Sequence, residues 1–316
     1  MPHHKGTKLS QKRSINYLAP LQWGHGNGMQ REIGRTGLQV FPVGLGAMPL
    51  SIRGRPREPA AIEVIRAALD AGVDFIDTAN SYCQDQRDVG HNERLIAKAL
   101  AELGATGRVT VATKGGLIRP GGAWEIDARP EALLAACERS LEDLRTDAIA
   151  LYQLHSPDRR VPFAESVGAL ARLREQGKIR HVGLSNVSVA QIREAQGIVP
   201  VASVQNRCNP QDRSDLRGNS GGGLVEFCAE QGIAYIPYSP VGGHQGHRSL
   251  GKHRLLRRIA GNYGVSPQRV MLAWLLGKGR HVFPIPGASR AASIQDSAAA
   301  VGLELSAEDA RRIDNL

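Results

Sequence analysis

Four residues whose side chains could move a proton lie at related places in the sequence. Asp77, Lys114 and His155 each come at or near the end of a short apolar run, and Tyr82 lies five residues after Asp77. Tyrosine is a weak acid, with a reference pKa of about 10, and a nearby lysine cation lowers that pKa by favouring the phenolate. Asp77 could keep Lys114 charged and oriented, while His155 could donate to a substrate oxygen or share in proton transfer. Together the four residues predict a site that protonates an oxyanion.

The elements that must position these residues are short, β-branched runs that are almost continuously apolar, as parallel strands covered on both faces should be. Eight such runs are predicted as strands: 43–48, 74–79, 109–114, 148–155, 179–186, 201–206, 234–239 and 281–286. Between them, segments such as 58–72, 129–144 and 163–178 carry apolar residues at three- and four-residue spacing, which predicts amphipathic helices.

Eight strand–helix units favour a closed (β/α)₈ TIM barrel of the α/β class over an open sheet. The catalytic groups of such barrels lie at the carboxyl ends of the strands. The polar residues Asn186, Gln205 and Tyr238 also lie at these ends, so we expect them to line the same pocket as the four proton-transfer residues.

The remaining segments complete the predicted domain organisation. Residues 30–42 predict an N-terminal β-hairpin with Gly37 near its turn, and residues 1–28, which are polar and basic without periodicity, predict a flexible extension. Residues 29–316 then form one barrel domain. Two long loops, 115–128 with Trp124 and the glycine-rich 241–254, are expected on the catalytic side as candidates for substrate or cofactor contact.

Composition narrows the class of protein. Of the 316 residues, 41% are hydrophobic and 22% charged, which is typical of a globular protein, and no stretch reaches the roughly 20 apolar residues of a membrane span. The net charge of +10 is spread along the chain without a recognised nucleic-acid motif, so neither a nucleic-acid nor a membrane partner is expected. The four cysteines form no CxxC pair, which favours a reducing, cytoplasmic location.

Two motif-like patterns are interpreted as incidental. The GxG at 44–46 has Pro49 where a Rossmann fingerprint needs its third glycine. His244 and His247 form an HxxH in a glycine-rich segment without supporting carboxylates or cysteines, which is typical of a solvated loop, so no metal site is expected.

Seven ordered segments show a resemblance to a known family. DFIDTANSY, VTVATKGG, LYQLHSPD, GLSN, SVQNR, YSPVGG and FPIPGAS resemble the signature segments of the aldo-keto reductase superfamily, over nearly all of the chain from residue 30. The resemblance implies a (β/α)₈ barrel that reduces an aldehyde or ketone to an alcohol, usually with NADPH. It makes Tyr82 the general acid, with Lys114 and Asp77 tuning its pKa and His155 orienting the carbonyl, while the nicotinamide delivers hydride.

The resemblance also implies which residues bind the cofactor. Ser185, Asn186 and Gln205 would hold the carboxamide, Tyr238 would stack on the nicotinamide, and Arg290 would bind the adenosine 2′-phosphate as a bidentate donor. The other implied contacts are Gly46, Ala47 and Met48 after the first strand, Ser239, Pro240 and Val241 in the loop over the pyrophosphate, and Gly287, Ala288, Ser289, Ser293 and Ser297 near the adenosine.

Ser293 and Ser297 depart from the family pattern, because relatives often carry an arginine or glutamine at the first position and an asparagine or glutamate at the second. Because Arg290 could still bind the 2′-phosphate, NADPH/NADP is the expected cofactor, with NADH also possible. The expected partner is a small-molecule carbonyl substrate. The alternatives are a regulatory or redox-sensing subunit that binds the cofactor with little turnover, and a barrel enzyme that eliminates or isomerises a sugar-like metabolite.

Overall fold

The computed structural model describes residues 29–217 and 223–316, so the extension expected at 1–28 lies outside the described residues. Seven parallel strands of this part form one curled sheet in the order β11-β10-β9-β8-β5-β4-β3. The strands are β3 (Leu45–Gly46), β4 (Phe75–Asp77), β5 (Thr110–Gly115), β8 (Ile149–Leu154), β9 (Ile179–Ser185), β10 (Val201–Gln205) and β11 (Ala234–Tyr235). Each lies within one of the segments expected to be a strand, except that β5 extends one residue further.

The eighth expected strand, 281–286, closes the sheet without forming a regular ladder. Parallel bridges join it to both edges of the sheet: Val282 pairs with Tyr235, and Gly287, the residue directly after the segment, pairs with Gly46. Pro284 and Pro286 lie within it and have no N–H to donate, although their carbonyl oxygens accept from Gly44 and Gly46. The proline spacing therefore explains why this segment is extended but irregular. The (β/α)₈ barrel is confirmed, with seven regular strands and one proline-containing closing segment.

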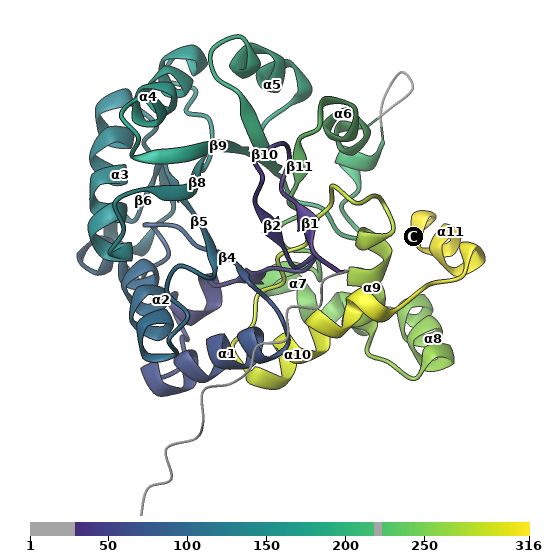
Figure 1. The fold of residues 1–316 in the computed structure, drawn as a ribbon. Coiled ribbons are helices and arrows are strands. Elements are labelled where there is room, and N and C mark those ends of the chain that lie inside the picture. Colours follow the sequence, from purple (N-terminus) through teal and green to yellow (C-terminus); the bar gives the residue numbers. More distant parts are fainter. Residues whose placement is uncertain (1–28, 218–222) are drawn as a thin grey trace, which may run out of the picture.

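Helices surround the barrel (Figure 1). They are α1 (Glu58–Asp70), α2 (His91–Glu102), α3 (Pro130–Leu144), α4 (Phe163–Glu175), α5 (Val189–Gln196), α6 (Leu224–Gln231), α7 (Gly243–Leu250), α8 (Arg254–Tyr263), α9 (Pro267–Leu276), α10 (Ala291–Ala298) and α11 (Ala307–Asp314). Short 3₁₀ turns are η1 (Met48–Leu50), η2 (Gln86–Asp88), η3 (Pro120–Gly122), η4 (Ser214–Leu216) and η5 (Ala299–Gly302). Helix starts follow sequence signals: Ser266 caps α9 by accepting from the Arg269 amide, and Pro267 follows it as the first helical residue.

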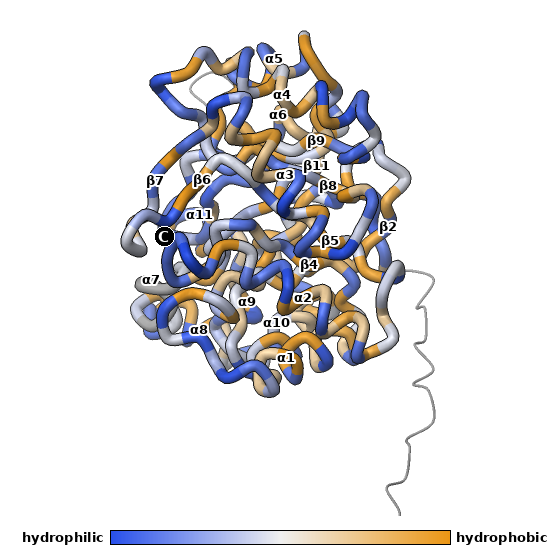
Figure 2. The backbone as a smooth tube through the Cα atoms, turned by 90° about the vertical axis from the view of Figure 1, so that its left-hand side faces the viewer, coloured by the Kyte–Doolittle hydropathy of each residue, from blue (hydrophilic) through white to orange (hydrophobic). Residues whose placement is uncertain are grey.

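Side chains of each strand alternate between the barrel interior and the surrounding helices. In β4, Phe75 belongs to the interior cluster and Ile76 packs against α1 and α2. In β8, Leu151 faces inward and Tyr152 outward, toward α3 and α4. Figure 2 shows apolar stretches mainly in the interior and hydrophilic stretches mainly in the connections around it.

The expected N-terminal hairpin is present and plugs one end of the barrel. Strands β1 (Arg31–Glu32) and β2 (Gln39–Val40) pair antiparallel, and Gly37 in the turn has φ +77, a conformation that favours glycine. Ile33 and Val40 are fully buried in the cluster that contains Phe75 and Ala202, which lie at the amino ends of their strands. The hairpin therefore covers the amino end of the barrel, and the carboxyl end remains for a site (Figure 1).

The two long segments expected on the catalytic side have different structures. Residues 115–128 include a small hairpin, β6 (Leu117–Ile118) with β7 (Glu125–Ile126), around the turn η3. The expectation of a loop at 241–254 is wrong, because Gly243–Leu250 form helix α7. Two glycines in eight residues lower helix propensity, so the sequence alone does not predict this helix.

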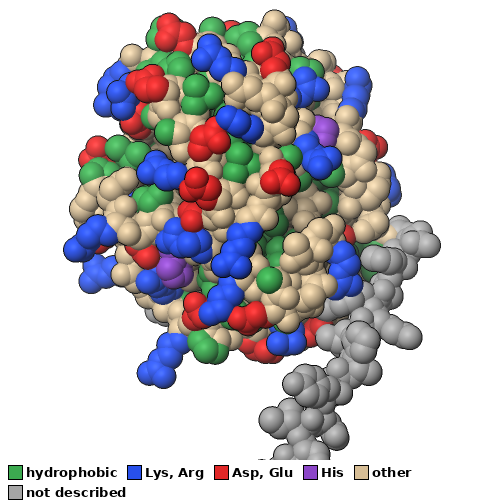
Figure 3. Space-filling model, turned by 60° about the vertical axis from the view of Figure 1, so that its left-hand side comes forward, with side chains coloured by type: hydrophobic (Ala, Val, Ile, Leu, Met, Phe, Trp, Pro, Cys, Tyr) green, Lys and Arg blue, Asp and Glu red, His purple; other side chains and the backbone are tan. Residues whose placement is uncertain are grey.

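No helix among the described residues is long and apolar enough to cross a membrane. On the face drawn in Figure 3, lysine and arginine side chains are interspersed with aspartate and glutamate. The four cysteines are free and buried.

Candidate active site

Strand alternation brings a carboxylate and an ammonium group together above the apolar interior. Asp77 lies two residues after the inward-facing Phe75, and Lys114 lies two residues after the inward-facing Ala112. Strands β4 and β5 pair with Asp77 opposite Ala112. Lys114 is fully buried, and its Nζ donates to Asp77 Oδ2 at 2.6 Å, to Thr78 O at 2.8 Å and to Tyr82 Oη at 3.1 Å. The three donated bonds use every N–H of the ammonium group.

The other carboxylate oxygen of Asp77 is held by two glutamines. Gln205 Nε2 donates to Asp77 Oδ1 at 2.8 Å, and Gln153 Nε2 donates to the same oxygen at 3.2 Å. Gln205 also donates to Gln153 Oε1 at 3.2 Å. Sequence reasoning missed Gln153, although a polar residue at an inward position of β8, two residues before His155, is a usable signal.

Tyr82 lies above Lys114 at the rim of the barrel and is 7% exposed. Its ring meets the His155 ring edge-on, with the centroids 5.7 Å apart. The structure therefore brings Asp77, Tyr82, Lys114 and His155 into one group. Three of them line a cavity of about 780 Å³, while Lys114 lies beneath the cavity and does not reach it.

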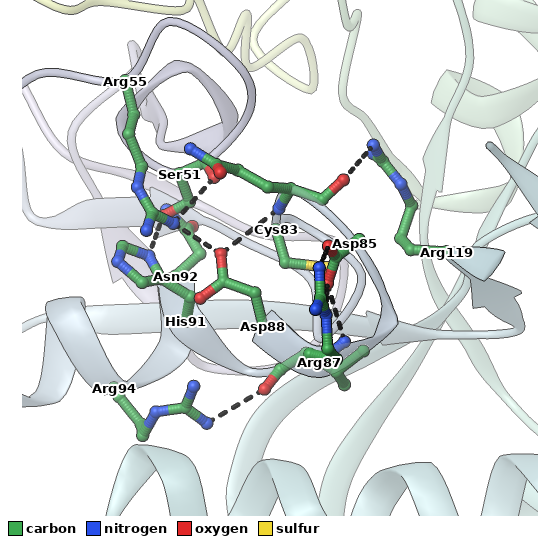
Figure 4. Close-up of polar contacts among 12 residues, drawn as sticks. Ser51, Arg55, Cys83, Asp85, Arg87, Asp88, His91, Asn92, Arg94 and Arg119 are labelled. Atoms are coloured by element: carbon green, nitrogen blue, oxygen red, sulfur yellow. Dashed lines mark hydrogen bonds and ion pairs between the residues drawn. The ribbon is translucent and has the colours of Figure 1, made fainter. Parts of the chain in front are cut away.

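The segment that follows Tyr82 is fastened by polar contacts (Figure 4). Asp88 Oδ2 accepts from Arg55 Nη1 at 2.5 Å, and Asn92 Nδ2 donates to Ser51 Oγ at 2.7 Å. Asn92 also accepts from Thr78 Oγ1 at 2.5 Å. These contacts hold the chain on both sides of Tyr82, so the phenol is positioned before any ligand binds.

Burial dominates the acidities at the site. The pKa of Tyr82 is raised well above its usual value, first by burial and then by the negative charge of Asp77. The expected lowering of this pKa is therefore wrong, although Lys114 lies at hydrogen-bond distance as expected. Burial, followed by the charge of Lys114, lowers the pKa of His155 well below its usual value. At neutral pH Tyr82 therefore carries its proton and His155 is an uncharged imidazole.

The cavity extends from this group across the carboxyl end of the barrel, and a volume of this size suits a small-molecule site. Of the sixteen residues implied as cofactor contacts, fifteen line it: Gly46, Met48, Ser185, Asn186, Gln205, Tyr238, Ser239, Pro240, Val241, Gly287, Ala288, Ser289, Arg290, Ser293 and Ser297. Ala47 is fully buried and lies outside the lining. The lining also includes residues for which the sequence predicted no individual contact with a ligand: Pro49, Leu117, Gly243, Gln268, Ile285, Pro286, Ala292 and Asp296.

Two non-glycine residues at the cavity have left-handed backbone conformations, Asn186 with φ +59 and Ser239 with φ +51. Such conformations are uncommon outside glycine and often lie at functional sites. Tyr238 Oη donates to Asn186 Oδ1 at 2.8 Å, and Asn186 Nδ2 donates to the carbonyl of His155 at 2.9 Å. The side-chain amide of Asn186 thus links His155, a member of the proton-transfer group, to Tyr238.

Gly46 lines the cavity for a packing reason as well. A Cβ at this position would lie 2.7 Å from the carbonyl oxygen of Ile285. Only glycine allows β3 to approach the closing segment this closely.

The far end of the cavity is bounded by the start of α10. Arg290 precedes the helix, is exposed and forms no ion pair within residues 29–217 and 223–316. Asp296 is paired with Arg269 at 2.7 Å, and Ser297 Oγ donates to the Ser293 carbonyl at 2.9 Å. Arg290 is therefore the cation at this end that remains available to an anionic ligand.

No group of three or more His, Cys, Asp or Glu side chains suited to a metal ion occurs among the described residues. The side chains of His244 and His247 lie outside the described part.

Comparisons with known proteins agree on one family. The model of the aldo/keto reductase family matches residues 42–316. A probable aldo-keto reductase of Glycine max is 32% identical over 311 residues, which cover 89% of this chain and 87% of the relative. A thermostable aldo-keto reductase in complex with the inhibitor epalrestat has a TM-score of 0.76 and 31% identity, covering 90% of this chain and 98% of its own. An aldo-keto reductase from Klebsiella pneumoniae in complex with NADPH has a TM-score of 0.75 and 25% identity, covering 90% and 94%.

Proposed function

Because the chain belongs to the aldo/keto reductase family, we propose that it is an NADPH-dependent enzyme that reduces the carbonyl group of a small aldehyde or ketone to an alcohol. The observation that carries the proposal is the contact of Lys114 with both Asp77 and Tyr82 at the floor of the cavity. This arrangement suits the protonation of an oxygen that gains negative charge.

The cavity fits NADPH. The K. pneumoniae relative was crystallised with this cofactor, and the cavity here has amide and hydroxyl groups near Tyr82 and the cation Arg290 at its far end. We propose that Ser185, Asn186 and Gln205 hold the nicotinamide carboxamide, that Tyr238 packs on its ring, and that Arg290 binds the 2′-phosphate. When bound, the nicotinamide supplies the hydride that adds to the carbonyl carbon.

Tyr82 supplies the proton in this proposal. Its raised pKa keeps it protonated at neutral pH, and the depressed pKa of His155 leaves that ring uncharged, so the phenol is the group with a proton to give. As the carbonyl oxygen becomes negative, the O–H bond of Tyr82 breaks and the proton forms the alcohol. Lys114 then stabilises the phenolate through its 3.1 Å contact. His155 donates a hydrogen bond that orients the carbonyl oxygen.

The test is NADPH consumption by wild type and Tyr82→Phe across a panel of aldehydes and ketones. We expect turnover to fall by about 100-fold or more, because proton donation is lost, while the NADPH dissociation constant stays nearly unchanged. Tyr263→Phe is a matched control, since the Tyr263 hydroxyl contacts Asp309 away from the cavity. Tight NADPH binding with no oxidation by wild type would favour a redox-sensing subunit, and undiminished turnover by Tyr82→Phe would exclude the phenol as the acid.

The four buried, free cysteines suit a reducing compartment. We therefore propose that the protein acts in the cytoplasm.

A further inference from the structure

Trp124 presents an unusually exposed aromatic surface beside the proposed acid. Its side chain lines the cavity and yet is 47% exposed. The ring meets Tyr82 edge-on, with the centroids 6.4 Å apart and the planes at 78°. Leu117, from the same β6–β7 hairpin, also lines the cavity. Covering exposed apolar tryptophan surface with a ligand lowers the free energy of the complex.

Arg119 holds this indole from behind. The Cζ of its guanidinium lies 3.7 Å from the centroid of the Trp124 ring. Arg119 is only 5% exposed, and its Nη2 donates to the carbonyl oxygens of Gln84 at 3.1 Å and Gly122 at 2.7 Å. Figure 4 shows the first of these bonds, which runs from Arg119 to the chain just after Cys83. A planar guanidinium anchored in this way can stack on one indole face and leave the other for a ligand.

The anchoring ties the β6–β7 hairpin to the segment that carries Tyr82. Gln84 lies two residues after Tyr82, and the Arg119 backbone amide donates to Gln86 Oε1 at 3.1 Å. The spacing between the indole and the phenol is therefore set by partly buried hydrogen bonds within the protein, and does not depend on the ligand.

We propose that Arg119 positions Trp124 as a stacking wall, so that the site prefers flat, aromatic carbonyl compounds over aliphatic ones of similar size. The proposal rests on the carbonyl-reductase function above. A ring lying against the open face of Trp124 places its carbonyl substituent next to Tyr82 and His155, which lie at the base of the same wall. Arg119 is a positioning residue, because it acts through Trp124 and does not line the cavity.

The experiment measures kcat and KM for benzaldehyde and butanal with NADPH, in wild type, Trp124→Leu, Arg119→Leu and Arg119→Lys. In Trp124→Leu we expect the ratio of kcat/KM for benzaldehyde to that for butanal to fall by about three- to ten-fold, the size of a lost aromatic contact. Arg119→Leu should lower the same ratio mainly through the KM for benzaldehyde. Arg119→Lys should resemble Arg119→Leu, because lysine keeps the charge but lacks the stacking plane.

Arg193→Leu is the matched control. Arg193 also stacks on an aromatic ring, that of Phe227 at 5.3 Å, but away from the cavity, so the ratio should not change. If Trp124→Leu still reduces both aldehydes with the wild-type ratio of kcat/KM values, the stacking role of Trp124 is overturned. The proposed carbonyl reduction would remain. If Arg119→Lys has the same ratio of kcat/KM values as wild type, the positioning role of the guanidinium plane is overturned. Reduction of neither aldehyde nor any other carbonyl by wild type would overturn the proposed function and this inference with it.

Discussion

Gln205 Nε2 lies 2.8 Å from Asp77 Oδ1, so a residue of the cavity lining is bonded directly to the carboxylate that pairs with Lys114. Gln153 lies behind this pair and touches both partners. A ligand group that binds Gln205 from the cavity therefore contacts the same side chain whose hydrogen bond orients Asp77. The buried part of the site is a connected network.

Gln153→Met should lower kcat by about ten-fold, because Asp77 loses one hydrogen bond to a charged group. NADPH affinity should change less than in Gln205→Met, since Gln153 does not line the cavity. Steady-state kinetics and NADPH titration would check both effects. Gln196→Met removes an exposed amide contact with Gln231 and should change neither; a similar loss there would show that the effect of Gln153 is not specific.

Lys114→Met should destabilise the fold as well as stop turnover. It leaves the carboxylate of Asp77, whose side chain is 2% exposed, without its cation, and breaking a buried pair costs about 3–5 kcal/mol. Urea unfolding would measure this loss. The double variant Lys114→Met/Asp77→Leu should recover part of the stability but no activity; a double variant as unstable as the sum of both single changes would contradict the pairing energy.

Arg290→Ala should weaken NADPH binding by much more than NADH binding, because only NADPH has the 2′-phosphate that a bidentate guanidinium can bind. Dissociation constants for both cofactors, measured by fluorescence titration, would test this. Arg269→Ala serves for comparison, since Arg269 is already paired with Asp296 at the same end of the cavity. Equal weakening of the two cofactors by Arg290→Ala would point to a contact other than the 2′-phosphate.

Glu93 should make stability depend on pH. Burial raises the pKa of this carboxyl from 4.5 to about 7, against the opposing effect of the hydrogen bond that it accepts from Thr113. The folded state then holds a proton that the unfolded state has lost, so the free energy of unfolding falls as pH rises from 4.5 to 7 and changes no further above that range.

Glu93→Gln resembles the protonated form at every pH. Its free energy of unfolding relative to wild type should therefore rise from near zero at pH 4.5 to about 3 kcal/mol at pH 7 and above. Denaturant titrations over this range would measure the difference. A constant difference between the two proteins would mean that Glu93 does not titrate there.

The sequence predicted the parts of the site that depend on strand periodicity. Asp77, Lys114 and His155 could be placed at one rim because each ends an apolar run, and alternation brings their side chains inward. The resemblance to a family supplied Arg290 and the stacking role expected of Tyr238, whose place at a strand end was already visible in the sequence. The irregular closing segment was also visible in principle, since Pro284 and Pro286 are read directly from the sequence.

Other features depend on depth and tertiary packing, which periodicity does not encode. The pKa of Tyr82 rises because the phenol is buried beside Asp77, and the sequence shows only that Lys114 is near. Helix α7 forms from a glycine-rich segment without clear periodicity. The stacking of Arg119 on Trp124 joins two residues of one loop whose conformation is set by contacts with the segment after Tyr82.

Because the N-terminal hairpin covers the amino end of the barrel, its interior opens to solvent at the carboxyl end. Lys114 is sealed from water, and Tyr82, the proposed acid, lines the cavity together with Asp77 and His155. In the proposed reaction, the proton that leaves with each alcohol must be replaced through the mouth by which that alcohol departs. Reprotonation of Tyr82 and release of the alcohol therefore use the same opening of the barrel. Solvent viscosity and solvent deuterium should then affect the same step of the catalytic cycle.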